Sequence, residues 1–517
     1  MSYLRVYGAE LGEHNKGACA DEHSYGQLMR SWSVMGGSAI LNYLISLLRV
    51  KIVAIYLGPS GVGLIGLYLS GTDLVATIFN GISSSAVREI VRAQDEHSIA
   101  RTVRTLRRAC WVVGLCGWLL AITLARPISD WLFHSTSHAV TISILGVTLV
   151  FNALFVGRVA LLQGLRRIED VAWTNISSAL LSTALAVGLY AWLGENGILP
   201  VLIATSLISF GVSCWFSRRV KISSAALSWA GTCRETKQLL RLGSAFIFIA
   251  IAAAGVDLFA RTIIANGFGI HAAGIYQAAW ALSGTFSAVV LSAMSADYYP
   301  RLSSIIHDSD LATQLVNRQL ELAVLITLPA LLVTLTFAPA IMEILYTEQF
   351  LEGAEVLRWM MLGAFCKALS WPLGFLPLAK GSARLAIANQ ALWALTQGAL
   401  LLWLSHAQGL VGVGQASAAA LALQGLLSAW VGRKLVGFAW SSAVKRLIVV
   451  SFAFISAVFA CEMFIKGITA LAAAGLITLI GCVFCLRSLA ERLNTDNPLI
   501  RGVSCMPGGW IILGRPK

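Results

Sequence analysis

Charged residues are scarce in this sequence. Asp, Glu, Lys and Arg make up 12% of the 517 residues, whereas hydrophobic residues make up 57%. Soluble domains usually contain about 25% charged and about 45–50% apolar residues, so this chain has too little polar surface to face water on all sides. The scarcity of charge excludes a soluble, a disordered and a collagen-like protein. It predicts an integral membrane protein.

Several chemical signatures are also missing. No Walker A sequence occurs, which excludes nucleotide hydrolysis through a P-loop. The ten cysteines are scattered, and the CxxC pair Cys482 and Cys485 has no second Cys or His pair nearby, so we expect neither disulfides nor a metal site. Gly61, Gly63 and Gly66 match GxGxxG, but they open an apolar segment, where glycines favour close helix packing. We therefore expect no catalytic residue, no metal and no cofactor.

Long apolar runs recur from about residue 34 to residue 486. Transmembrane barrels alternate apolar and polar residues, so unbroken runs of this kind predict spanning helices instead. At roughly 20 apolar residues per span, the apolar positions suffice for about 14 transmembrane helices. The fold class that we predict is an all-α polytopic membrane protein. Residues 1–30 lack the pattern of a signal peptide and are predicted to be a flexible leader.

Basic residues are confined to alternate loops. The loops after even-numbered predicted spans contain Lys and Arg, as in 88–108 and 218–241. The opposite loops contain none, namely 57–60, 127–138, 194–197, 267–271, 347–354 and 405–409. Because Lys and Arg accumulate on the cytosolic side of membrane proteins, this pattern predicts an even number of spans and two cytosolic termini. It also accounts for the net charge of +13 without nucleic acid as a partner.

An internal repeat organises the spans. "LGPSGVGLIGLY" begins at Leu57 and resembles "FGIHAAGIYQAA", which begins at Phe268; Gly58 aligns with Gly269, and Gly63 with Gly274. A repeat in the same orientation predicts two six-helix lobes related by an axis along the membrane normal, with two helices added, as in a transporter. The predicted segments are a cytosolic leader (1–30), an N-terminal lobe (31–220), a cytosolic linker (221–242), a C-terminal lobe (243–432), two additional helices (433–487) and a cytosolic tail (488–517).

A few ionisable residues fall inside predicted spans, where a charge costs several kcal/mol unless it faces protein, water or a counter-charge. The basic ones are Arg49, Lys51, Arg261 and Lys367, and the acidic ones are Asp73 and Asp257. Snorkelling to the membrane surface explains any one of the first three, but all three together favour a cationic cavity. Asp73 and Asp257 are candidate charge partners or coupling groups: Asp73 for Lys367, and Asp257 for Arg261, one helical turn away.

The basic loop 88–108 alternates apolar residues with Arg, which predicts an amphipathic helix on the inner leaflet. Anchoring to the membrane is the simpler role for such a helix. Recruitment of an anionic lipid-linked substrate to the mouth of a cavity is a second hypothesis.

The segment "SLLRVKIVAIYLGPSGVGLIGLYLSGTDLVATIFNGISSSAVREI" resembles the first two helices of bacterial O-antigen flippases, which translocate lipid-linked oligosaccharides. These belong to the multidrug, oligosaccharidyl-lipid and polysaccharide exporter superfamily. The resemblance implies a MATE-like fold in the bacterial inner membrane that flips undecaprenyl-pyrophosphate-linked repeat units for surface polysaccharide synthesis. It also implies a cationic cavity for the substrate, and Arg49, Lys51, Arg261 and Lys367 are the residues that fit it. Other glycan assembly proteins, such as a polymerase or a chain-length regulator, are implied partners.

Two alternatives remain open. A multidrug or cation antiporter of the same superfamily would be expected to place carboxylates in its cavity. A membrane-embedded glycan polymerase or ligase would normally need a large extracytosolic loop with catalytic residues, and every predicted outer loop is short. The sequence therefore favours a transporter over an enzyme. It does not identify the sugar, the energy source or the oligomeric state.

Overall fold

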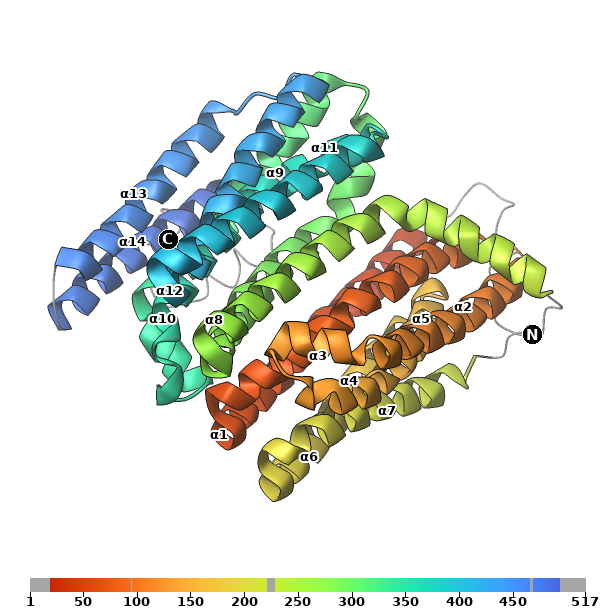
Figure 1. Ribbon diagram of the computed structural model, residues 1–517. Helices are drawn as coiled ribbons and strands as arrows, with labels where there is room; N and C mark the ends of the chain where they lie inside the picture. Colours follow the sequence, from red (N-terminus) through yellow and green to blue (C-terminus); the bar gives the residue numbers. More distant parts are fainter. Residues whose placement is uncertain (1–18, 94, 221–227, 465–467, 493–517) are drawn as a thin grey trace.

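The computed structural model describes residues 19–93, 95–220, 228–464 and 468–492, and all regular secondary structure in this part is helical (Figure 1). The N-terminal helices are α1 (Cys19–Arg92), α2 (Glu96–Thr123), α3 (Ala125–Phe133), α4 (Ala139–Leu145), α5 (Val147–Gly164), α6 (Ile168–Leu193) and α7 (Ile198–Ser217). The C-terminal helices are α8 (Trp229–Ile305), α9 (Ser309–Leu345), α10 (Gly353–Gly374), α11 (Leu376–Ala379) and α12 (Ala383–Val436). Two further helices follow, α13 (Ser442–Phe464) and α14 (Ile468–Arg492).

Three of the long helices are hairpins that turn at a glycine. Gly58 in α1, Gly269 in α8 and Gly409 in α12 have φ values of 59°, 89° and 65°. Positive φ is strained for residues with a Cβ, so glycine is favoured at such a turn. In α8, Arg261 before the turn donates to Gln277 after it. In α12, Gln397 donates to Ser417 in the same way. The two arms of each hairpin therefore lie side by side.

The helices form two neighbouring groups. Figure 1 shows α1–α7, red to yellow, beside α8–α12, green to blue. The α1 and α8 hairpins make the largest contact between the groups, while α13 and α14 pack on α9 and on each other. Two of the buried clusters follow the same division, because one draws on residues 53–202 and another on residues 298–448; a third joins Ala54 and Val62 of α1 to the C-terminal helices. The predicted boundaries of the lobes stay a prediction.

Ten helical stretches of the described chain are long and apolar enough to cross a membrane. Four of them contain between 42 and 54 residues. At 1.5 Å per residue these four are about twice as long as the ~30 Å hydrocarbon layer requires. Three of the four contain the glycine turns described above, so each arm is long enough for one crossing. The exact number of fourteen crossings stays a prediction.

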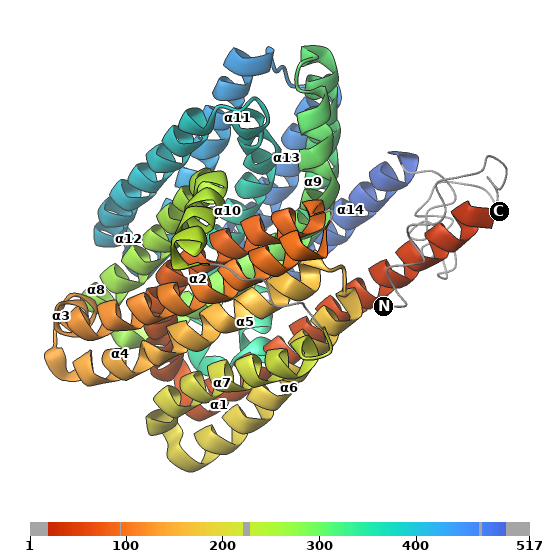
Figure 2. The same cartoon turned by 90° about the vertical axis from the view of Figure 1, so that its right-hand side faces the viewer.

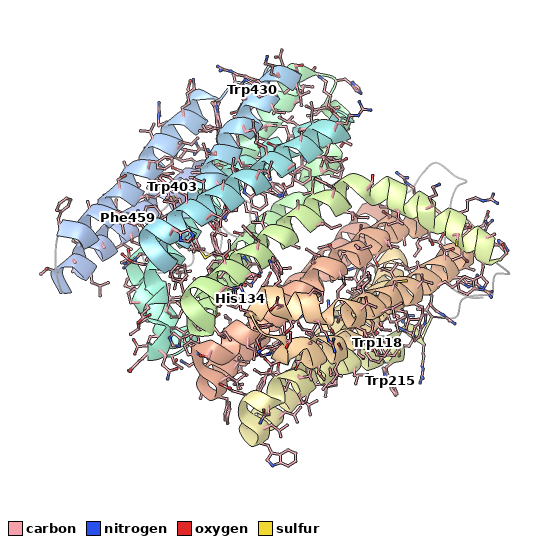
Figure 3. The ribbon with its side chains drawn as sticks, in the orientation of Figure 1. Trp118, His134, Trp215, Trp403, Trp430 and Phe459 are labelled. Atoms are coloured by element: carbon pink, nitrogen blue, oxygen red, sulfur yellow. The ribbon has the colours of Figure 1, made fainter. Side chains whose placement is uncertain are left out.

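The outside of the bundle is apolar. Trp215, Trp403 and Trp430 are 66%, 68% and 57% exposed. Figure 3 shows them on α7 and α12, distributed over different sides of the molecule. Exposed apolar side chains on this scale would cause aggregation in water but suit contact with lipid. The chain is therefore a multi-pass membrane protein.

The bundle has two chemically different ends. One end carries the turns at Gly58, Gly269 and Gly409, and we call it the glycine-turn end. The opposite end, called the basic end, carries the Arg-containing ends of helices, among them Arg92 of α1, Arg219 after α7 and Arg433 of α12. This separation of charge agrees with the alternation of basic loops along the sequence.

Three segments differ from their expected local structure. The predicted leader is helical from Cys19 onward, and Figure 2 shows this first part of α1 projecting beyond the other helices. The linker 221–242 is helical from Trp229, so α8 begins inside it. Loop 88–108 does not form one separate surface helix, because α1 continues to Arg92 and α2 begins at Glu96. Residues 1–18 and 493–517 of the predicted leader and tail lie outside the described residues.

Candidate functional site

Arg49 lines a cavity of about 350 Å³ that lies mainly among the N-terminal helices, and we call it the Arg49 cavity. Both arms of α1 contribute to its wall, as do α5, α6 and α7. Gln277 and Tyr346 reach it from the C-terminal group. The Arg49 guanidinium donates from Nη2 to Thr205 Oγ1 at 3.3 Å. The cavity thus offers one cation with a single neutral partner.

Lys367 lines a second cavity, of about 440 Å³, among α8, α10 and α12, and we call it the Lys367 cleft. Its side chain is exposed, and residues of both α8 arms and both α12 arms share the cleft. The Asp257 carboxylate also lines it and accepts from Trp280 Nε1 at 3.1 Å. The charge of Lys367 acts on this carboxylate. The cleft therefore holds both signs of charge.

Arg261 lies between these two spaces and is only 4% exposed. Its Nε donates to Gln277 Oε1 at 2.7 Å, and its guanidinium carbon lies 4.2 Å from the ring centre of Trp280. Gln277 lines the Arg49 cavity, whereas Trp280 lines the Lys367 cleft. Arg261 and Asp257 thus contact the same indole, the former over its ring and the latter at its N–H. Arg261 holds the wall between the cavities instead of facing an open space.

Lys51 is not among the residues that line either space. Its Nζ donates to the backbone carbonyl of Glu343 at 3.0 Å and also to that of Tyr346. These carbonyls belong to the last turn of α9 and the residue after it, where a cation offsets the negative end of the helix dipole. Lys51 therefore ties α1 to α9 at the glycine-turn end, and the structure does not bring it together with Arg49 or Lys367.

The α1 and α8 hairpins touch at the glycines that the repeat aligned. An added Cβ on Gly63 would lie 2.7 Å from the backbone nitrogen of Gly274, and one on Gly274 would overlap the carbonyl oxygen of Pro59. Only residues without a side chain allow this approach. Together with the Lys51 contact, the crossing closes the molecule between its two groups of helices at the glycine-turn end.

The candidate acidic partners have different surroundings. Asp73 is exposed, and among the described residues it forms no ion pair with Lys367. The charges of Arg261 and Asp257 act on it instead. The hypothesis of an Asp73–Lys367 pair is therefore not supported by this conformation. Asp257 and Arg261 meet through Trp280, one helical turn apart on α8.

Unpaired polar atoms gather in the Lys367 cleft. Among the described residues, seven buried side-chain nitrogen or oxygen atoms have no hydrogen-bond partner. Four are Ser or Thr hydroxyls; the other three are Asn389 Oδ1, Trp393 Nε1 and Gln397 Oε1. All three of these residues line the cleft from α12. A buried polar group without a partner costs about 1–3 kcal/mol, so this arrangement indicates a place for a polar ligand or for water.

A third cavity, of about 880 Å³, lies at the basic end between α2, α5 and α7. Its cations are Arg104, Arg107, Arg108 and Arg158. Arg108 donates to Thr232 at 2.8 Å, and Arg158 donates to Ser217 at the same distance. Three arginines of segment 88–108 therefore line a cavity, and the recruitment of an anionic lipid-linked substrate by this segment stays a hypothesis.

The sequence had pointed to the charged residues but not to their neutral partners. Thr205, Gln277 and Trp280 carry no distinguishing sequence signal. The polar residues of α12 do carry one, because Asn389, Trp393 and Gln397 are four residues apart and therefore share one helix face. A polar stripe along a predicted span would have indicated an inward-facing surface.

Comparisons with known proteins agree with the fold and the resemblance. A family model described as "Polysaccharide biosynthesis protein" matches residues 52–355, more than half of the chain. The lipid III flippase of Escherichia coli (strain K12) is 22% identical over 382 residues, covering 72% of this chain and 89% of the relative. A Shigella flexneri relative named "Putative O-antigen transporter" is 23% identical over 412 residues, covering 77% of this chain and 96% of the relative.

Solved structures share the architecture. A structure of the lipid II flippase MurJ in an inward closed conformation has a TM-score of 0.67 at 12% identity and covers 89% of this chain and 99% of its own. An inward-facing MATE family multidrug transporter of the MOP superfamily has a TM-score of 0.65 at 14% identity and covers 78% of this chain and 96% of its own. The family resemblance and the all-helical, MATE-like fold that the sequence predicted are confirmed.

Proposed function

The chain belongs to the polysaccharide biosynthesis protein family, and we propose that it flips lipid-linked oligosaccharide repeat units across a bacterial inner membrane. The named relatives include a lipid III flippase, and MurJ, a lipid II flippase, shares the fold. In this proposal the substrate is an undecaprenyl-pyrophosphate-linked oligosaccharide destined for O-antigen or another surface polysaccharide. The protein is a transporter and not an enzyme.

The observation that carries the proposal is the placement of Arg49 and Lys367. Both cations line cavities inside a bundle with an apolar exterior, and neither is bound to a carboxylate by a salt bridge in the described chain. Cations at such depth are expensive and usually mark a substrate path. A pyrophosphate carries negative charge and several acceptor oxygens, which guanidinium and ammonium groups match well. Arg261 acts indirectly, by holding Gln277 and Trp280 at the two cavity walls.

Transport follows from movement of the two helix groups around these cations. The Gly63–Gly274 crossing and the Lys51 contact close the glycine-turn end in the present conformation. Alternating access requires this end to open and the basic end to close around the bound pyrophosphate. The lipid chain remains in the bilayer while the headgroup crosses through the protein. The basic cavity with Arg104 and Arg158 attracts the anionic headgroup at the start of this path.

The distribution of basic residues supports an orientation in the membrane. With the basic end in the cytosol, the glycine-turn end faces the periplasm and both termini are cytosolic. The flipped product then reaches the side on which a polymerase and a chain-length regulator assemble surface glycan. These proteins are the partners of the proposed pathway.

Deletion of the gene tests the function through two pools measured together. We expect surface polysaccharide to fall while undecaprenyl-pyrophosphate-linked oligosaccharide accumulates on the cytosolic leaflet. Single repeat units that reach the outer leaflet without being polymerised would instead indicate a polymerase. An unchanged pair of pools, combined with increased sensitivity to cationic drugs, would indicate an antiporter.

Complementation of the deletion tests the cationic site. Lys367→Gln removes the ammonium group from the cleft and should restore less than about a tenth of the surface polysaccharide, if the lost charge is worth more than 1.4 kcal/mol to substrate binding. Lys445→Gln is the matched control, because it removes an equal charge from the exposed start of α13. Equal complementation by the two variants at equal protein levels would contradict the assignment of Lys367.

A further inference from the structure

We propose that the α12 face of the Lys367 cleft binds uncharged saccharide groups, so that the glycan and the pyrophosphate of one substrate molecule have separate binding surfaces. The proposal rests on the function stated above, because it names the part of a lipid-linked oligosaccharide that this cleft holds. It rests on Asn389, Trp393 and Gln397. None of the arguments about charged residues depends on these three side chains.

The three side chains form one row along the first arm of α12. Successive members are four residues apart, which is about 6 Å along a helix at 1.5 Å per residue. Asn389 Nδ2 donates to Ser428 Oγ at 3.3 Å, and Gln397 Nε2 donates to Ser417 Oγ at 3.1 Å. Both serines belong to the second arm of α12. One end of each amide is thus fixed inside the hairpin, and this orients the other end.

The other ends have no partner in the described structure. Asn389 Oδ1, Gln397 Oε1 and Trp393 Nε1 are buried and unpaired, and the Gln397 side chain is only 4% exposed. Turning either amide by 180° would pair its oxygen with the serine and leave its NH₂ group unpaired instead. An unpaired polar end therefore remains at both amides in either orientation. Three such ends in one row indicate a ligand with several neutral polar groups.

The chemistry of the row distinguishes between the parts of the substrate. In the described orientation the two amide carbonyls need hydrogen-bond donors, and a pyrophosphate, which has only acceptor oxygens, offers none. A cation could satisfy the carbonyls but cannot accept a hydrogen bond from the indole N–H of Trp393. A sugar hydroxyl both donates and accepts, and an acetamido group provides one donor and one acceptor. Saccharide groups are therefore the class that matches all three unpaired ends.

Aromatic rings complete the surface. Trp371 and Phe375 of α10 and its C-cap line the same cleft, with ring centres 4.8 Å apart in an edge-to-face arrangement. The C–H bonds on one face of a pyranose ring pack well against such rings, while its hydroxyls point outward to amides. The cleft volume of about 440 Å³ lies in the range of about 300–1,000 Å³ that is typical of small-molecule sites. The anion-binding Lys367 and the saccharide-binding row thus share one cleft.

The test compares two probes on the full-length purified protein in nanodiscs. One probe is the lipid-linked oligosaccharide extracted from cells in which the gene is deleted, and the other is undecaprenyl pyrophosphate without sugar. We expect wild type to bind the first at least tenfold more tightly. Gln397→Leu and Trp393→Phe should each lose most of this difference while their affinity for the bare pyrophosphate stays within twofold of wild type. Gln314→Leu, at an exposed position of α9, is the matched control.

Each outcome separates the two proposals. Equal binding of both probes by wild type, or a preference that survives both cleft variants, would overturn the saccharide surface and leave the flippase proposal standing; water alone would then satisfy the three unpaired ends. Binding of neither probe would overturn both proposals. A Lys367→Gln variant that weakens both probes by the same factor would support the division between anion and glycan surfaces. A thermal unfolding midpoint close to wild type shows that each variant is folded.

Discussion

The α1 and α8 hairpins each carry an arginine in the arm before the glycine turn, and the two arginines have different environments. Arg49 and Arg261 both precede a glycine turn, at nearly the same position in the aligned repeat. Arg49 has one neutral partner, Thr205, and lines a cavity. Arg261 is 4% exposed, bonded to one side chain and stacked on another. One arginine is available to a ligand, and the other supports the wall.

This difference shows that the depth of a charge in a membrane protein does not decide its role. Partners on the second arm of α8, Gln277 and Trp280, occupy the guanidinium of Arg261. The second arm of α1 lines the cavity of Arg49 mainly with apolar residues, among them Ile65 and Leu69, and gives Arg49 no hydrogen-bond partner in the described structure. The two aligned hairpins therefore place one arginine at a cavity and the other in the wall between two cavities. The comparison can be tested at the crossing of the hairpins, at each arginine and at the groups around them.

The largest effect is expected where the two hairpins touch. Gly274→Ala would drive a Cβ into the backbone of Pro59, which cannot move without separating α1 from α8. Overpacking usually costs about 1–3 kcal/mol, and we expect the upper end or more because both contact partners are backbone. Thermal unfolding of the purified variant and complementation of the deletion measure the loss of stability and of transport.

Gly188→Ala is the matched control for this substitution. Gly188 lies in α6 with no heavy atom within 4 Å of an added Cβ. Alanine in a helix interior is favoured over glycine by about 0.5–1 kcal/mol, so this variant should be slightly more stable than wild type. If both variants unfolded at the same temperature, the close approach of α1 and α8 would not be a stability determinant.

The two arginines should separate stability from transport. Arg261→Gln removes a buried cation from Gln277 and from the neighbourhood of Asp257, and we expect a loss of about 2–4 kcal/mol in unfolding free energy. Arg49→Gln leaves only Thr205 without its donor, so its stability should change by less than about 1 kcal/mol. Its complementation should nevertheless fall about tenfold, which corresponds to about 1.4 kcal/mol of substrate binding. If Arg261→Gln and Arg49→Gln lost similar amounts of unfolding free energy, the two arginines would not differ in their structural role.

The sequence predicts the helical class, the repeat and the charges inside spans because each depends on local composition or spacing. Long apolar runs require helices in lipid, and the aligned Gly63 and Gly274 indeed meet in the structure. Arg49 and Lys367 line cavities, as expected of cations placed inside spans. These features need no knowledge of which helices are neighbours.

Features that depend on distant partners were not predictable in this way. Lys51 was expected in the cavity, but its ammonium reaches α9, nearly 300 residues away. Whether a cation faces a carbonyl, an indole or open space depends on the packing of other helices. The start of α8 inside the predicted linker likewise has a distant contact, since Glu235 there meets Arg101 of α2 at 2.7 Å. The spacing of residues along the chain does not reveal contacts between residues that are far apart in sequence.

A smaller effect is expected at Lys51, which lies in the first arm of α1 and contacts the end of α9 at the glycine-turn end. Lys51→Met keeps the aliphatic stem but removes the ammonium from the carbonyls of Glu343 and Tyr346. A cation at a helix C-terminus contributes up to about 1–2 kcal/mol, so thermal stability should drop modestly. Lys51→Arg should recover part of this loss, because a guanidinium can also donate to carbonyls. Recovery by Lys51→Gln to the same extent would show that charge is not involved.

The smallest effect is expected in the row of Asn389, Trp393 and Gln397 on α12. Gln397→Leu removes one hydrogen bond to Ser417 and one unpaired carbonyl. Loss of the hydrogen bond should lower the unfolding free energy by about 0.5–1.5 kcal/mol. Removal of the buried, unpaired carbonyl should raise it by about 1–3 kcal/mol. The ligand-free variant should therefore be as stable as wild type or slightly more stable. Differential scanning fluorimetry without ligand measures this. A loss of more than about 2 kcal/mol would mean that Gln397 serves the packing of α12, because a side chain kept for a ligand should cost little to replace when the ligand is absent.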